Sequence, residues 1–343
     1  MGLVRAMCGI CGIYDPNPEV VLSPELLSGM VESLIHRGPD GQGMIVEGGL
    51  GLGHTRLMII DLVTGHQPME SPDGRAVIVF NGEIYNFKEL RRDLLAKGFK
   101  FNTSSDTEVI LNLYRARGLE SIRLLNGIFA LALWDRDRKQ LVLARDRLGI
   151  KPLYYSILNQ NRVIFGSEVK AILASGEVGP EVNHQALWDL FTFQNILGSK
   201  TLFSGVELLE PASLLVIDQD GHRKERYWQL SFDESNDKDI DYYRERLWYT
   251  FNQAVERQLV SDVPVGGYLS GGMDSGSVVA TAARHIRPLH TFTCGFDISN
   301  VSQQETLFDE RVKAEKLSQL LDTQHHECFL FPGAMQEVVD KLV

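Results

Sequence analysis

A polar, acidic stretch from residue 229 to residue 241 divides this 343-residue chain into two parts with different patterns. The stretch has neither helical nor strand periodicity, and we predict that it is a linker. Before it, short apolar runs alternate with turn residues, whereas apolar runs, a glycine-rich turn and amphipathic segments follow it. A chain of this length usually needs more than one hydrophobic core, so two domains are expected.

The first part is dominated by predicted strands, which cover residues 76–80, 127–134, 140–145, 154–157 and 163–165. Helices are expected over residues 24–35, 87–97, 107–117 and 184–192. The first of these helices has a good start signal, because Ser23 precedes Pro24 and Glu25 follows. Strand pairs mixed with helices in this way indicate a sandwich of sheets covered by helices.

The second part predicts alternating helices and strands, at residues 242–259, 263–269, 277–285, 289–294 and 310–321. This order is typical of a doubly wound α/β domain. The run Ser270-Gly271-Gly272-Met273-Asp274-Ser275 lies between a predicted strand end and a helix start. Backbone amides at such a position, together with the positive end of the helix, can hold phosphates. A tight turn is the alternative, but the strand–loop–helix context favours a nucleotide.

Near the start of the chain, Cys8 follows an internal methionine, Met7. Either Met7 is the true start or residues 1–7 are a pro-segment, and in both cases Cys8 would become the first residue. Its free α-amino group, with an ordinary pKa of about 7.7–8.0, could then serve as the base for its own thiol. The alternative is a buried cysteine in an N-terminal strand.

The other cysteines and histidines predict no metal site. Four cysteines are too few for a disulfide framework in a chain of this size. Cys8 and Cys11 have the spacing of half a zinc site, but no second pair follows, and we expect Cys11 to pack in the core. His325 and His326 are interpreted as surface polarity.

Several polar clusters accompany Cys8 in the first part. Arg56 comes just before a predicted apolar strand, and Asn81-Gly82 at a strand end offers an amide pair suited to an oxyanion hole. Asp106 starts a helix, which it could simply cap. Taken singly, each cluster has a structural alternative: a salt bridge, a turn or a helix cap.

Taken together, the motifs carry a resemblance that covers the chain from Met7 to its end. They are Met-Cys8-Gly-Ile, His36-Arg-Gly-Pro-Asp-Gly41, Arg56-Leu, Asn81-Gly-Glu-Ile-Tyr-Asn86, Ser105-Asp106, Ala144-Arg-Asp-Arg-Leu-Gly-Ile-Lys-Pro-Leu-Tyr-Tyr155, Ser167-Glu-Val-Lys-Ala171, Ser270-Gly-Gly-Met-Asp-Ser275 and Thr291-Phe-Thr-Cys-Gly295. The chain resembles the glutamine-hydrolysing asparagine synthetases. The resemblance implies an αββα N-terminal-nucleophile (Ntn) hydrolase domain over residues 8–228. An incomplete doubly wound adenine-nucleotide α-hydrolase-like domain, the start of an ATP pyrophosphatase, would follow over residues 242–343.

For the first domain, the resemblance implies that Cys8 attacks glutamine and that Asn81 and Gly82 hold the oxyanion. Arg56 would pair with the substrate α-carboxylate. The α-ammonium would be received by Asp106 with Glu83 nearby. The backbone that would line the site belongs to Leu57, Met58, Ile59 and Ile60.

For the second domain, the resemblance implies that ATP activates aspartate as β-aspartyl-AMP, with Mg²⁺ neutralising charge, and that ammonia then displaces AMP. The implied ATP-binding residues are Leu269, Ser270, Gly271, Gly272, Asp274, Ser275 and Cys294. The chain would thus be a carbon–nitrogen ligase of asparagine biosynthesis. Its oligomeric state stays open, a homodimer being one state that the sequence allows.

Composition and charge argue against nucleic-acid binding and against a membrane or secreted location. The formal net charge of −11 argues against nucleic-acid binding, which needs a basic face. No apolar run approaches the roughly 20 residues that span a bilayer, and the first residues lack the pattern of a signal peptide. A cytoplasmic protein without membrane contact is expected.

Three features depart from the family pattern. Seven residues precede Cys8, Met58 stands where a serine is usual, and the chain stops at Val343, before the later synthetase motifs, which suggests truncation. Two rival hypotheses therefore stay open. One is a glutaminase alone or an amidotransferase for another carboxylate; the other is a non-catalytic chain that binds glutamine or ATP.

Overall fold

The computed structural model describes residues 7–232, 238–296, 309–331, 333 and 336. Residues 1–6 of the expected pro-segment and 233–237 of the predicted linker lie outside these ranges. The chain divides into two compact units, residues 1–232 and 233–343, which are treated separately below.

The first unit contains two six-stranded sheets. In spatial order, the first sheet consists of β10 (Glu207–Leu208), β8 (Tyr154–Ile157), β9 (Val163–Gly166), β1 (Gly9–Tyr14), β3 (Leu50–Arg56) and β2 (Gly41–Glu47). The second consists of β12 (Gly221–Arg226), β11 (Ser213–Asp218), β7 (Gln140–Arg145), β6 (Gly127–Asp135), β5 (Ala76–Ile84) and β4 (Met69–Glu70). Neighbouring strands are antiparallel throughout both sheets.

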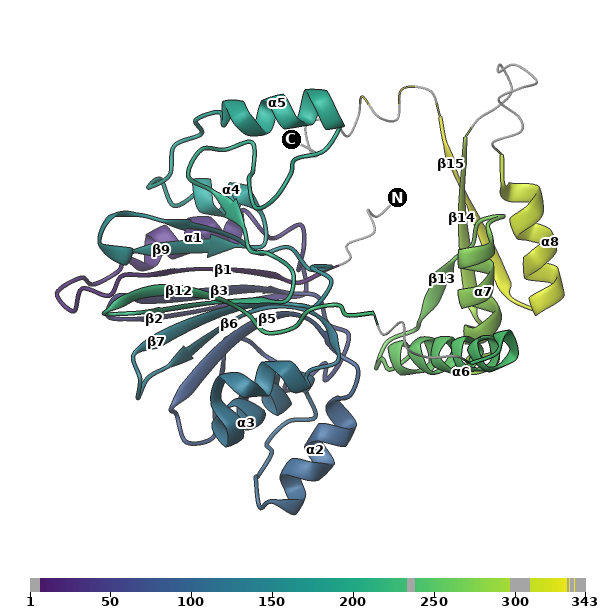
Figure 1. The fold of residues 1–343 in the computed structure, drawn as a ribbon, viewed down its shortest axis with the longest axis horizontal. Helices are drawn as coiled ribbons and strands as arrows, with labels where there is room; N and C mark the ends of the chain where they lie inside the picture. The colour runs from purple at the N-terminus through teal and green to yellow at the C-terminus, as the bar shows by residue number, and fades with distance from the viewer. Residues whose placement is uncertain (1–6, 233–237, 297–308, 332, 334–335, 337–343) are drawn as a thin grey trace. The chain divides into compact units, whose positions relative to one another are not determined.

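Helices cover the outer faces of the two sheets, which makes an αββα sandwich (Figure 1). The helices of this unit are α1 (Pro24–Glu32), α2 (Phe87–Ala96), α3 (Asp106–Arg117), α4 (Val169–Leu173) and α5 (His184–Phe193), with short 3-10 turns at Gly118–Leu124 and Asn159–Asn161. Helices α1 and α4 pack on the first sheet, and α3 packs on β5 of the second. The expected fold class is therefore confirmed for this unit.

Alternation along β3 explains how one strand serves two cores. Leu50 and Leu52 face the second sheet and join the core between the sheets. Gly53 faces α1, where an added Cβ would lie 2.4 Å from the Val31 side chain. Glycine therefore lets the helix approach the strand closely. Cys11 on β1 is fully buried in the core beneath α1, as predicted.

Two predictions about strand ends in this unit are wrong. The apolar run after Arg56 forms a loop, because β3 ends at Arg56 and the amides of Leu57 and Met58 bond to Cys8 Sγ and Asp40. Asn81 and Gly82 lie inside β5, whose ladder with β6 continues to Ile84. Both differences arise from partners distant in sequence, which local patterns do not reveal.

The second unit is a parallel sheet in the order β13–β14–β15, formed by Gly266–Tyr268, His290–Phe296 and Gln324–Leu330. Its helices are α6 (Ile240–Gln258), α7 (Met273–Ala282) and α8 (Arg311–Leu321). Strand, helix and parallel strand alternate, as the doubly wound pattern predicts. The small core contains Val255, Leu269, Val279 and Leu289, among others.

Three boundaries in the second unit correct the predictions. Helix α6 begins at Ile240, inside the predicted linker, with Asp239 as its N-cap. Helix α7 begins at Met273, so Asp274 and Ser275 lie in its first turn rather than in the preceding loop. Strand β15 was not predicted; it follows α8 and contains His325, which is partly buried, and His326, which is exposed as expected of surface polarity. None of the described helices is long and apolar enough to span a membrane.

Candidate active site

A polar pocket lies where β1 begins and where β3 and β5 end. Eight residues that line it were proposed from the sequence: Cys8, Arg56, Leu57, Ile59, Ile60, Gly82, Glu83 and Asp106. Further lining residues are Gly65, Gln67, Phe80, Ser105 and Thr107. Met58 and Asn81, although proposed, are not among the lining residues. The structure thus brings residues separated by up to 99 positions, from Cys8 to Thr107, into one site.

Cys8 is half-buried directly before β1, with its sulfur against the loop that follows β3. The Leu57 amide donates a hydrogen bond to Cys8 Sγ at 3.3 Å, and Sγ lies 3.6 Å from the Leu57 carbonyl oxygen. Burial raises the pKa of the Cys8 thiol, whereas the Leu57 amide and the positive charges of Lys151 and Arg56 lower it. The thiolate is therefore opposed by burial and favoured by this amide and these cations.

Arg56 presents a cation to the same pocket. Its side chain is almost fully buried, and its guanidinium contacts backbone carbonyl oxygens of Ile60, Asp61 and Leu62. Within the described ranges, no carboxylate lies at ion-pair distance (4.0 Å) from it. The Asp61 carboxylate is nevertheless close enough for the charge of Arg56 to lower its pKa. Because the guanidinium hydrogen-bonds only to carbonyl oxygens, it can still bind a carboxylate in a bidentate manner.

The amide of Asn81 is buried and unpaired. Asn81 is 1% exposed, and its Nδ2 finds no hydrogen-bond partner among the described atoms. Such orphaned donors are rare in proteins and need an explanation, such as a catalytic role. The neighbouring Gly82 lines the pocket, and an added Cβ there would lie 2.2 Å from the Ile128 carbonyl oxygen. Only glycine therefore fits at this position.

Two carboxylates, Glu83 and Asp106, share the other side of the pocket. Burial raises the pKa of both, and the negative charge of Asp106 raises that of Glu83 further. Asp106 accepts a hydrogen bond from the Ile84 amide at 3.0 Å, which favours its ionised form. Asp106 is not the helix cap: Ser105 caps α3 by accepting from the Thr107 amide. A cation bound on this side of the pocket would favour the ionised form of both carboxylates.

Two cations near Cys8 had no predicted role. Arg37 donates from Nε to the Cys8 carbonyl oxygen at 3.0 Å and from Nη1 to Glu168 at 2.8 Å. Lys151 is close enough to the thiol for each charge to affect the pKa of the other. Both residues lie in motifs that carry the family resemblance, and that placement was the available signal. Their spacing from Cys8 in the sequence gave no indication of contact.

In the second unit, a loop of four residues, 269–272, connects β13 to α7. Ser270 and Ser275 hold the loop together, with their hydroxyl oxygens 2.7 Å apart and the Ser270 amide donating to Ser275 Oγ. The Gly272 amide donates to Ser270 Oγ at 3.2 Å. Asp274 lies in the first turn of α7. Backbone amides at a loop and helix start of this kind can bind phosphates, and the ATP-binding role of these residues stays a prediction.

Leu269 and Cys294, the two residues proposed beside the adenine, lie toward the carboxyl ends of neighbouring parallel strands. The Leu269 amide donates to the Phe292 carbonyl oxygen at 2.9 Å. Leu269 is buried, whereas Cys294 on β14 is exposed. Ligands of open α/β sheets bind at this edge, so both residues lie where a nucleotide would be expected.

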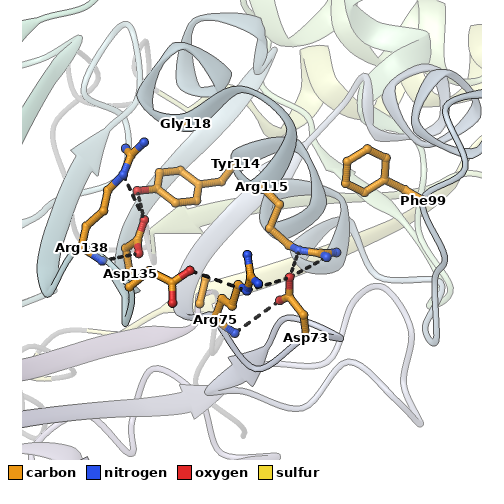
Figure 2. Close-up of a pocket in the computed structure, with 10 residues that line it drawn as sticks. Asp73, Arg75, Phe99, Tyr114, Arg115, Gly118, Asp135 and Arg138 are labelled. Carbon is orange, nitrogen blue, oxygen red and sulfur yellow. Dashed lines mark hydrogen bonds and ion pairs between the residues drawn. The ribbon is translucent and has the colours of Figure 1, made fainter.

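A second polar pocket lies at the far end of α3 and the start of β5 (Figure 2). It is lined by Asp73, Arg75, Ala76, Phe99, Tyr114, Arg115, Gly118, Asp135, Asp137 and Arg138. Its charges compensate one another: Asp73 pairs with Arg115 at 2.6 Å, and Asp135 accepts from the Tyr114 hydroxyl at 2.9 Å. Arg75 lies between Asp73 and Asp137, at 3.9 and 3.6 Å. No proposed site residue lines this pocket.

Two known protein families match the chain, one in each unit. Residues 7–228 match the glutamine amidotransferase domain family, and residues 247–343 match the asparagine synthase family. The fold is similar to the solved structure of the allosteric regulatory enzyme of purine biosynthesis, with a TM-score of 0.51. That likeness covers 96% of this chain and 91% of the other at 15% sequence identity, so it concerns the fold alone. The first unit is therefore a glutamine amidotransferase domain.

Curated relatives define the family more narrowly. Asparagine synthetase [glutamine-hydrolyzing] 3 of Bacillus subtilis is 36% identical over 98% of this chain. Putative asparagine synthetase [glutamine-hydrolyzing] 2 of Methanocaldococcus jannaschii is 34% identical over 98% of it. The chain belongs to the glutamine-hydrolysing asparagine synthetase family. It spans 56% of the length of the first relative and 67% of the second.

Proposed function

We propose that this chain hydrolyses glutamine at Cys8 and that the ammonia aminates ATP-activated aspartate, giving asparagine, AMP and pyrophosphate. One observation carries the proposal: the Cys8 thiol, the Arg56 guanidinium and the Glu83–Asp106 carboxylates line one pocket. These groups match the three polar parts of glutamine, which are its side-chain amide, its α-carboxylate and its α-ammonium. A second copy of this set is not found among the described residues.

In the proposed reaction, Cys8 Sγ bonds to the amide carbon of glutamine while the thiol proton passes to the α-amine of a chain that begins at Cys8. The oxyanion that forms is held by Asn81 Nδ2 and the Gly82 amide, which is consistent with the unpaired state of Nδ2. The carbon–nitrogen bond then breaks, and the amine returns the proton to the departing ammonia. Water hydrolyses the thioester to glutamate and the free thiol.

The substrate backbone would be held by charge. Arg56 would bind the α-carboxylate with two parallel hydrogen bonds. Asp106, kept ionised by the Ile84 amide, and Glu83 would receive the α-ammonium. Because a bound cation lowers the raised pKa of Glu83, substrate binding would itself favour the ionised carboxylate. The backbone from Leu57 to Ile60 would enclose the side chain of the substrate.

In the second unit, residues 270–272 of the loop after β13 and the first turn of α7, with Asp274 and Ser275, would hold the phosphates of ATP. Leu269 and Cys294 would flank the adenine. Asp274 supplies a carboxylate oxygen of the type that Mg²⁺ prefers, and the ion when bound would neutralise phosphate charge. An aspartate carboxylate would attack the α-phosphate, releasing pyrophosphate, and ammonia would displace AMP. We place this reaction in the cytoplasm, with a homodimer as the assembly to test by light scattering.

The test begins with the intact mass and N-terminal sequence of the purified protein, followed by glutamate release from glutamine. A protein that begins at Cys8 should hydrolyse glutamine, and Cys8→Ala should abolish this activity while sparing ammonia-dependent AMP release. Equal loss of both activities in a folded Cys8→Ala protein would mean that Cys8 is structural. Glutamine hydrolysis without aspartate-dependent AMP release would instead support a glutaminase or a different carboxylate acceptor.

A further inference from the structure

Lys151 is held in a fixed position by the loop that follows β7. Asp146, which is 1% exposed, accepts hydrogen bonds from the amides of Leu148, Ile150 and Lys151 at 3.1, 3.0 and 2.9 Å. Arg145 donates from Nε to the Lys151 carbonyl oxygen at 2.8 Å. Both backbone polar groups of Lys151 are therefore bound to side chains, which restricts where its own side chain can reach.

The same carboxylate connects Lys151 to the proposed oxyanion hole. Asp146 Oδ2 accepts from the Lys151 amide at 2.9 Å and from the Phe129 amide at 3.2 Å. Phe129 is the cross-strand partner of Gly82, and the ideal Cβ of Gly82 would lie 2.7 Å from the Phe129 Cα. The Asp146 carboxylate thus connects the backbone of Lys151 to Phe129, the residue opposite Gly82 in the neighbouring strand.

The ammonium of Lys151 has no direct partner in the part of the chain that the structure describes. Its side chain is half-buried, and neither a hydrogen bond of Nζ nor a carboxylate within 4.0 Å is found there. Burial and the Arg37 guanidinium lower the pKa of Lys151, whereas the negative charges of Glu83, Cys8 and Asp146 raise it. A half-buried cation without a paired anion is costly to keep, so a function at this position is expected.

We propose that Lys151 supports the glutaminase reaction electrostatically: its positive charge offsets the negative charge of the Cys8 thiolate and of the tetrahedral intermediate. This inference rests on the proposed function, because it assigns Lys151 to the same site. The thiolate is opposed by burial and by the carboxylate of Glu83, and a fixed cation reduces both penalties. No bond to Lys151 forms or breaks during the reaction.

The first experiment compares Lys151→Met and Lys151→Arg with the matched control Lys224→Met, all as the protein that begins at Cys8. Lys224 is 35% exposed and pairs with Glu207 at 3.6 Å, away from the pocket residues. Lys151→Met should lower kcat for glutamine hydrolysis at pH 7 about tenfold and move the acidic limb of the pH–rate profile up by about one unit. KM should change less, Lys151→Arg should restore most of kcat, and Lys224→Met should match the wild type.

The second experiment measures the thiol itself, without glutamine. The rate of Cys8 alkylation by iodoacetamide is followed against pH by mass spectrometry of the Cys8 peptide, with thermal melting as a folding check. Folded Lys151→Met should show a higher apparent thiol pKa than Lys151→Arg. Unchanged alkylation and pH–rate profiles in folded Lys151→Met would overturn the inference. Because alkylation needs no turnover, it tests Lys151 even if the glutaminase proposal fails.

Discussion

The two polar pockets at opposite ends of α3 and β5 have similar residue types and different states of charge pairing. In the pocket of Figure 2, Asp73 pairs with Arg115, and Asp135 with Tyr114 and Arg138. Beside the pocket of Cys8, Asn81 Nδ2 lacks a hydrogen-bond partner, and in the pocket Arg56 has no carboxylate within 4.0 Å, among the residues described. One pocket has its internal interactions complete, whereas the other leaves donors and charges available.

This difference identifies a site better than the number of charged side chains does. Paired charges at a surface contribute modest stability and offer a ligand little that is not already used. Unpaired buried donors cost free energy, so a fold retains them where a ligand or transition state completes them. Two of the following predictions test whether the two pockets differ in this way, and a third concerns a buried histidine near Arg56; they are given in order of decreasing expected effect.

The largest effect is expected at Asn81. Because its Nδ2 has no hydrogen-bond partner among the described atoms, Asn81→Ala should lower kcat for glutamine hydrolysis about 100- to 1000-fold, the usual cost of one oxyanion donor. Steady-state kinetics measure the effect on catalysis, and thermal melting measures the effect on stability. Asn112→Ala is the matched control, since Asn112 is equally buried but donates to the Lys100 carbonyl oxygen at 3.0 Å.

Asn112→Ala should lower the melting temperature and leave kcat unchanged in the folded protein. The reverse outcome, with Asn81→Ala unstable and fully active, would show that the unpaired amide has a structural role only.

A second, smaller effect concerns His54, which lies two residues before Arg56 on β3 and is 1% exposed. Burial lowers the pKa of His54 to about 3, although the nearby Phe80 backbone favours the proton. Its usual pKa is 6.5, so the unfolded chain binds the proton first as the pH falls. Relative to pH 7, the free energy of unfolding should therefore decrease between pH 6.5 and 3, by about 2 kcal/mol at pH 5 from this residue.

Urea unfolding of wild type and His54→Leu at pH 7 and pH 5 measures this contribution. The variant should lose less stability than the wild type over the same interval. An equal loss in both proteins would mean that other groups cause the acid sensitivity and that His54 is not held neutral by burial.

The smallest effect is expected in the paired pocket, at Tyr114. Tyr114→Phe removes the hydroxyl that donates to Asp135, so it should lower the free energy of unfolding by about 1 kcal/mol. Glutamine hydrolysis should keep its kcat and KM, because Tyr114 lies at the other end of α3 from Asp106. A clear change in kcat would show that the two pockets are coupled and would remove the contrast between them.

Much of the fold was predictable because it depends on local patterns. Strands β7 and β8 have the predicted bounds, and helices start at Pro24, Phe87 and His184 as predicted, the first of them from its start signal. The layered class also followed from the order of the elements. Residues 57–60 show the limit, because their apolar run predicts a strand. The amides of Leu57 and Met58 instead bond to groups distant in the sequence, Cys8 Sγ and Asp40.

The candidate site was predictable where motifs carried it and hidden where only packing assembled it. The resemblance proposed Arg56, Glu83 and Asp106, and the structure places all three in the pocket with Cys8. Their catalytic roles stay predictions. Lys151 lies within one of these motifs, but no role was predicted for it. Its relation to Cys8 depends on the hydrogen bonds of Asp146 to Phe129 on β6 and to Lys151 in the loop after β7.

The contact between the Leu57 amide and Cys8 also sets the size of the atom that can occupy this position. Its N–S distance of 3.3 Å suits the large radius of sulfur but exceeds the 2.9–3.0 Å typical of an amide bonded to oxygen. A serine hydroxyl, on a shorter bond to Cβ, would lie still further from the amide. The backbone after β3 is thus placed at a distance that suits sulfur, and a hydroxyl at this position would lose the hydrogen bond from the Leu57 amide that the thiol accepts.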